Sequence, residues 1–133
     1  MLGGGNPVGS NPAGTGTGIN FIGNHAFSYS GTVAVTNVEK NMLKFATGNE
    51  YLVAEFNMAC DSGSGDDFDF IIRINGEIIL KSQITTPAQP GSRFINPIKL
   101  VIPNSSNVEV TLENVTQASA LDWTVTMSGR VYH

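Results

Sequence analysis

The chain has 133 residues, a formal net charge of −4, 14% charged residues and one cysteine. This length suits a single domain with one core, and the lack of a basic patch argues against a nucleic-acid partner. A lone cysteine cannot form an internal disulfide. No apolar run reaches the length of a membrane span, so we expect no membrane partner.

The first 23 residues differ in composition from the rest, because they are rich in Gly, Asn, Pro and Thr and carry no charge. Such a segment cannot offset its ordering entropy alone, so we expect an extended arm over 1–23 and a folded domain over 24–133. The arm is expected to lie on a neighbouring subunit or on a host surface, anchored by Ile19, Phe21 and Ile22. The alternative is an arm folded back over its own domain. The start of the chain lacks the basic and apolar regions of a secretory signal, which predicts synthesis in the cytoplasm without a signal peptide.

From residue 25 onward, alternating apolar and polar residues predict β-strands almost throughout. The first strand spans 27–35 and groups Phe27, Tyr29, Val33 and Val35 on one face, with Gly31 as a bend or bulge. Further strands are expected over 42–46, 51–58, 100–102, 108–113 and 123–132, and a long link with three prolines over 85–97.

Residues 66–81 predict a hairpin, because Asn75-Gly76 suits a two-residue type I′ turn. Uninterrupted pairing would place Ile74 opposite Glu77, Ile72 opposite Ile79, and Phe70 opposite Lys81. Both faces of this hairpin are apolar at its middle. One face must line the core, so the other needs a cover, which is either a loop of the same chain or a neighbouring subunit. The interface residues expected there are Ile71, Ile78 and Leu80, or else the face of Phe68, Phe70, Ile72 and Ile79.

These elements amount to about eight strands with no helical periodicity. The fold class predicted is all-β, a single jelly-roll-like antiparallel β-sandwich. An immunoglobulin-like sandwich is the alternative, but the Cys…Trp…Cys spacing of that fold is absent.

Few residues suit catalysis, so we expect no enzyme and no cofactor. The only histidines are His25 and His133, and a packed Cys60 thiol is favoured over a Cys60–His25 pair. Asp61, Asp66, Asp67 and Asp69 form the one carboxylate cluster. They could hold a calcium ion, but a solvated hairpin entry whose charges prevent edge aggregation is favoured.

Two tyrosines, Tyr51 and Tyr132, fall on outward strand positions and are candidate ligand-facing aromatics, whereas Trp123 is in register with core residues. Exposed aromatic rings can stack on sugars and are also common in protein interfaces.

The segments FSYSGTVAV, DFDFIIRINGEIIL, NPIKLVIPNSSNVEVTLENVT and SGRVY together resemble small β-sandwich structural proteins of tailed phages, marine ones in particular. The resemblance covers about residues 25–132. It implies virion structure: a capsid decoration, or cement, protein or a related head or tail component. Such a protein is expected to form a homotrimer, to bind the major capsid protein or another virion protein, and to be located in the virion. The alternative function is a carbohydrate- or receptor-binding module of a phage fibre, or of a trimeric jelly roll of the C1q or tumour-necrosis-factor type.

Overall fold

Two antiparallel sheets pack face to face in the computed structural model, which describes residues 18–60, 65–86, 93–118 and 120–133. The described residues contain ten strands and no helix: β1 (Asn20–Ile22), β2 (His25–Tyr29), β3 (Val33–Val35), β4 (Lys40–Ala46), β5 (Tyr51–Cys60), β6 (Asp67–Ile74), β7 (Glu77–Thr85), β8 (Arg93–Ile102), β9 (Asn107–Asn114) and β10 (Leu121–Tyr132). The predicted all-β, jelly-roll-like sandwich is confirmed.

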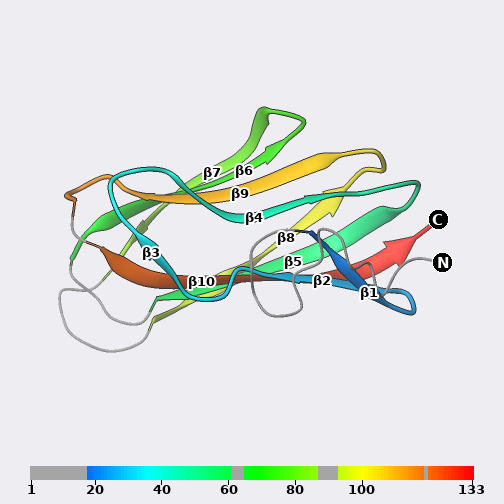
Figure 1. Ribbon diagram of the computed structural model, residues 1–133, viewed down its shortest axis with the longest axis horizontal. Coiled ribbons are helices and arrows are strands. Elements are labelled where there is room, and N and C mark those ends of the chain that lie inside the picture. Colours follow the sequence, from blue (N-terminus) through cyan, green and yellow to red (C-terminus); the bar gives the residue numbers. More distant parts are fainter. Residues whose placement is uncertain (1–17, 61–64, 87–92, 119) are drawn as a thin grey trace.

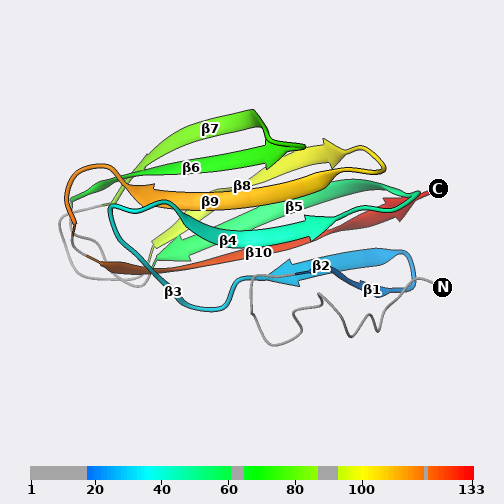
Figure 2. The ribbon, with the colours of Figure 1, turned by 45° about the horizontal axis from the view of Figure 1, so that its top comes forward.

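The larger sheet has the strand order β1-β2-β10-β5-β8, with β3 also paired to β10. The smaller sheet has the order β4-β9-β6-β7. Figures 1 and 2 show the two layers, with β7 and β8 as end strands along the same side of the sandwich. Both sheets are antiparallel, so each can bury one face and leave the other to solvent.

The core lies between the sheets and follows the predicted alternation in β5, β9 and β10. Trp123 of β10 meets Phe68 of β6 across the core, with ring centroids 5.1 Å apart. Among the largest fully buried side chains are Trp123, Phe56, Phe68, Phe70, Leu52, Met58, Leu112 and Met127. Period-two alternation in β5, β9 and β10 therefore identifies core residues correctly.

The β6–β7 hairpin turns at Asn75-Gly76 as predicted, with positive φ angles of 53° and 85°. Its expected register is wrong beyond the first two pairs. A bulge leaves Ile79 without a partner, so Ile72 pairs with Leu80 and Phe70 with Ser82. A bulge places two residues of one strand opposite one of the other, and such irregularities are frequent in end strands like β7.

The predicted link over 85–97 is shorter in the structure, because β7 continues to Thr85 and β8 already begins at Arg93. Pro97 lies inside β8, at a register shift between the pairs Ile95–Met58 and Ile98–Phe56. A proline is tolerated there because β8 is an end strand and a bulge needs no ladder hydrogen bond.

The segment just before residue 24 belongs to the sandwich. β1 pairs with β2, Ile19 is in the core and Phe21 packs against it. The Gly18 N–H donates to the Lys44 carbonyl at 2.7 Å. The expectation that Ile19 anchors the chain to a neighbour is therefore wrong, because its side chain is buried in its own domain. Phe21 is only partly buried and Ile22 is 68% exposed, so for these two residues the expectation stays a prediction. Residues 1–17 of the expected arm lie outside the described residues.

Candidate functional site

The expected interface residues of the β6–β7 hairpin separate into two groups. Ile71 is only 5% exposed and is not available to a partner, whereas Leu80 is partly buried and packs against the core of its own domain. Phe68, Phe70 and Ile72 are fully buried in the core as well. Ile78 and Ile79 remain, 52% and 49% exposed on the end strand β7. We call these two residues the β7 tip.

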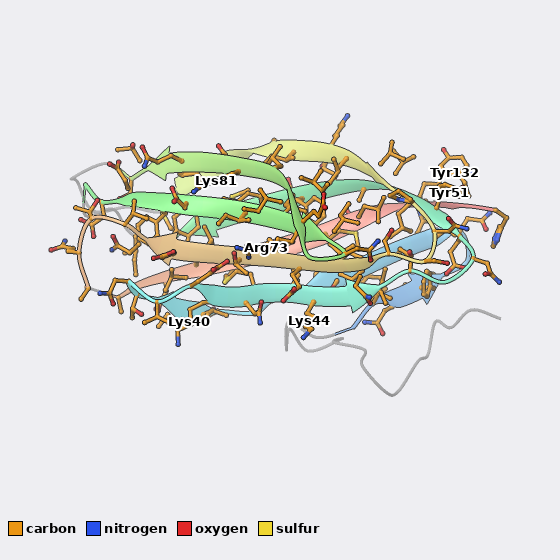
Figure 3. The ribbon with its side chains drawn as sticks, turned by 90° about the horizontal axis from the view of Figure 1, so that it is seen from above. Lys40, Lys44, Tyr51, Arg73, Lys81 and Tyr132 are labelled. Carbon is orange, nitrogen blue, oxygen red and sulfur yellow. The ribbon has the colours of Figure 1, made fainter. Side chains whose placement is uncertain are left out.

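Ile71 is covered by polar neighbours of its own chain, although it lies on the outer face of the four-stranded sheet. Its cross-strand partners are Lys81 and Thr111. Figure 3 shows Arg73 near the middle of this face and Lys81 on the adjoining strand. The alkyl stems of long polar side chains can cover apolar surface in this way. The second apolar face of the hairpin thus needs less external cover than the sequence pattern indicates.

Glu39 is the centre of a charge network on that same face. Arg73 Nη1 and Thr111 Oγ1 both donate hydrogen bonds to Glu39 Oε2. The hydrogen bond from Arg73, followed by the one from Thr111, lowers the pKa of the Glu39 carboxyl below its usual range. The network joins the segment before β4 to β6 and β9, so it stabilises the order of the strands.

The aspartates considered as calcium ligands are divided among separate structural contacts. Asp66 is buried and accepts hydrogen bonds from Asn114 Nδ2 at 2.9 Å and Gln117 Nε2 at 2.7 Å. Asp67 accepts from the Thr85 hydroxyl at 2.7 Å, and Asp69 lies 3.7 Å from Lys81 Nζ. Asp61 lies outside the described residues. Within the described ranges, no group of three or more His, Cys, Asp or Glu side chains is placed to hold a metal ion.

Cys60 and His25 are far apart. The Cys60 thiol is buried on the inner face of β5, whereas His25 lies on the outer face beside Arg130, which in turn pairs with Val53. Val53 and Cys60 are seven residues apart on one strand, which corresponds to about 23 Å. These two residues therefore cannot form a nucleophile–base pair.

The outer face of the six-stranded sheet displays most of the exposed apolar surface in the part of the chain that the structure describes. Six of its ten exposed large apolar side chains lie there: Ile22, Tyr29, Tyr51, Val53, Val101 and Tyr132. Monomeric proteins seldom gather apolar side chains on one face without a binding role. This face is the candidate binding surface.

Tyr51 and Tyr132 occupy the outward positions predicted for them. They are direct cross-strand partners on β5 and β10, and Figure 3 shows them side by side at one end of the molecule. The guanidinium of Arg130 lies 5.8 Å from the centre of the Tyr132 ring, within the range of a cation–π contact.

A depression of about 540 Å³, which we call the outer hollow, lies beside these tyrosines on the same face. Its lining comes from five strands: Ile22, His25, Ala26, Phe27, Tyr29, Val53, Ala54, Glu55, Lys99, Ser128 and Gly129. Neither Tyr51 nor Tyr132 is among them. The rings of Phe27 and Tyr29 lie 5.2 Å apart at its β2 side.

Sequence reasoning missed Phe27 and Tyr29, because it grouped them with Val33 and Val35 on one strand face. In the structure Ser28 and Ser30 point inward instead, and Gly31, with a φ of 68°, separates β2 from β3. The signal that was available is the Ser-Tyr-Ser-Gly run, since a break at a glycine shifts the alternation by one residue and turns every side chain to the other face.

No protein-family model and no curated protein matches the chain. Similar solved structures include latent PorU from Porphyromonas gingivalis (13% identity, TM-score 0.46) and the infectious bursal disease virus Gx strain (15% identity, TM-score 0.41). A CBM4 structure has 10% identity and a TM-score of 0.35.

The alignments with these three cover 78%, 82% and 86% of this chain, and 11%, 29% and 87% of the respective neighbours. The chain therefore spans only about a tenth to three-tenths of the length of the first two. With identities of 10–15% and TM-scores below 0.5, these similarities assign no family to the chain. No helix in the described ranges is long and apolar enough to cross a membrane.

Proposed function

We propose that the protein is a non-enzymatic virion structural protein of the capsid decoration type, which associates with further copies of itself and binds the capsid shell. The proposal follows the resemblance of residues 25–132 to small phage β-sandwich proteins. The observation that carries it is the β7 tip, where two isoleucines remain about half exposed on an end strand.

The β7 tip favours contact with a different surface of the neighbour over pairing of β7 with itself. The bulge at Ile79 interrupts the regular spacing of backbone groups that a second strand would need. A contact between two unlike surfaces does not give a two-fold dimer, and it closes into a ring where the rotation between copies permits. The trimer implied by the resemblance is such a ring.

The strength of this contact fits assembly on a shell better than a stable free oligomer. Burying the exposed halves of two isoleucines contributes about 1.5–3 kcal/mol in total. Association costs about 4 kcal/mol or more in lost translational and rotational freedom. The two isoleucines therefore cannot hold copies together by themselves, and the contacts around them must add the remainder for copies to associate at sub-millimolar concentration. A shell that holds several copies close together strengthens the same contact.

Sedimentation equilibrium of the full chain tests the subunit contact. We expect a weight-average mass that rises with concentration from one copy towards three, and a monomer at every concentration for the double variant Ile78→Ser/Ile79→Ser. Val38→Ser/Val115→Ser is the matched control, because both valines are exposed outside the sheets. A wild-type chain that stays monomeric to about 1 mM would overturn the proposed oligomer.

The location is tested separately, by mass spectrometry and immunogold labelling of purified particles of the virus that encodes the chain. We expect the protein on the head surface at a stoichiometry related to the shell lattice. Its absence from purified particles would overturn the decoration role.

A further inference from the structure

We propose that the outer hollow on the six-stranded sheet binds a neutral saccharide, with one hexopyranose ring against Phe27 and Tyr29 and its hydroxyl groups on the facing polar side chains. A volume of about 540 Å³ falls within the usual range for small-ligand sites, about 300–1,000 Å³. The inference does not depend on the proposed virion role.

The β2 side of the outer hollow supplies aromatic surface. Phe27 and Tyr29 occupy successive outward positions of β2, and Tyr29 is 39% exposed. A pyranose ring presents several C–H groups on one face, which pack well on an aromatic ring, while a tyrosine hydroxyl can still reach a polar partner. The exposed ring of Tyr29 is therefore the main stacking surface.

The side of the outer hollow opposite β2 supplies hydrogen-bonding groups in the same cross-strand row as Phe27. One cross-strand row runs from Phe27 through Ser128 and Glu55 to Lys99, on four adjacent strands. Ser128 carries a hydroxyl, Glu55 accepts hydrogen bonds and Lys99 donates them. A ligand in this row meets an aromatic ring at one end and both donors and acceptors at the other, as a polyhydroxylated ring requires.

The charges of the lining favour a neutral ligand. Glu55 and Lys99 are direct cross-strand partners and carry opposite charges, so the lining has no net charge when His25 is neutral. A carboxylate or sulfate group bound beside Lys99 would also lie beside Glu55, which repels it. An apolar ligand, in turn, would leave the polar groups of this row without their water partners.

A row of small residues lies beneath the outer hollow, with its two alanines buried on the core side of the sheet. The next cross-strand row consists of Ala26, Gly129 and Ala54 on three adjacent strands. A Cβ atom at Gly129 would lie 2.5 Å from the Val53 carbonyl oxygen, so β5 and β10 approach closely at this point. Close backbone approach at a glycine is typical of a local bend in a sheet. Ser128, the smallest outward side chain of its row, leaves the space above the bend open.

The test is binding of the full chain to a glycan microarray that carries neutral glucose-, galactose- and mannose-containing oligosaccharides together with sialylated and sulfated ones. We expect signal on neutral glycans. Titration calorimetry with the strongest neutral oligosaccharide should then show a loss of affinity of about tenfold or more for Tyr29→Ala. Ser128→Leu, which fills the outer hollow from an exposed position, should abolish binding.

Tyr51→Ala is the matched control, because Tyr51 is similarly exposed (45%) on the same face but does not line the outer hollow. It should leave the affinity unchanged, and all variants should keep the wild-type thermal midpoint. Three outcomes overturn the proposal: no neutral glycan binds, only acidic glycans bind, or Tyr51→Ala weakens binding as much as Tyr29→Ala. If Tyr29→Ala does not fold, unchanged affinity of Ser128→Leu overturns it alone.

Discussion

At the scale of single residues, Glu39 makes the stability of the four-stranded sheet depend on pH. Its pKa is lowered, first by the hydrogen bond from Arg73 and then by that from Thr111. A carboxyl whose folded pKa lies below its unfolded value stabilises the protein above the unfolded value, about 4.3, and loses that contribution as the pH falls through the folded value. The expected dependence of stability on pH is therefore a decrease on the acid side.

We predict that Glu39→Gln lowers the free energy of unfolding at pH 7, and that its difference from wild type shrinks as the pH falls from about 5 to about 3. Urea unfolding at a series of pH values measures this. Glu77→Gln removes the same charge at an exposed position beside the hairpin turn, and we expect it to change the free energy of unfolding by less than about 0.5 kcal/mol at pH 7. A Glu39→Gln difference that stays constant down to pH 3 would contradict the assignment.

Which residues face outward could be predicted from the sequence only where the alternation is unbroken. Leu52, Phe56, Val125 and Met127 are buried as their period of two predicts. An unbroken alternation over 27–35 places Phe27 and Tyr29 on the same face as Val33 and Val35. In the structure the break at Gly31 shifts the alternation, so Phe27 and Tyr29 face outward. The candidate site was missed for the same reason, since its aromatic side consists of these two rings.

At the scale of elements, the alternation of apolar and polar residues predicts where the strands lie, whereas bulges and register shifts depend on the partner strand. The turn at Asn75-Gly76 is determined locally, because it needs two residues with positive φ. The bulge at Ile79 is not, because nothing in the β7 sequence separates it from a regular end strand. Pro97 likewise lies within β8 only because a register shift opposite β5 accommodates it.

The short strand β1 gives a prediction at this scale. Deleting residues 1–17 should leave the stability of the sandwich unchanged, because β1 and the first described contact, at Gly18, are kept. Deleting residues 1–22 also removes Ile19 and Phe21 and leaves β2 without one neighbour, so we expect a loss of about 2–5 kcal/mol.

Thermal and urea unfolding of the two truncated chains measure this difference. Equal stability of the two truncated chains would show that β1 adds little to the core. A large loss already on deletion of 1–17 would show that the core of the described residues is incomplete without them.

At the scale of the whole molecule, the apolar content of the strands predicts more hydrophobic surface than a single copy of the chain can bury. The structure reduces that surplus. Ile71 is covered by polar side chains, Ile19 joins the core and Leu80 packs against it. Among the described residues, the large apolar side chains that stay exposed are the β7 tip, those on the outer face of the six-stranded sheet, and the two loop valines Val38 and Val115. The sandwich class could be predicted from the sequence because it depends on the sum of many strand patterns. The interface could not, because it depends on which few residues the register leaves uncovered.

This redistribution makes the fold independent of assembly, which leads to a final prediction. Because the core closes within one chain, the Ile78→Ser/Ile79→Ser variant should fold as a monomer, with a thermal midpoint that does not change with protein concentration. Wild type should have a midpoint that rises between about 5 µM and about 500 µM, since association stabilises the folded state by mass action. Scanning calorimetry at both concentrations measures the two slopes. If the midpoint depends on concentration equally in wild type and variant, the β7 tip takes no part in assembly. A variant that is unfolded at the lower concentration would show that the core itself needs a neighbour.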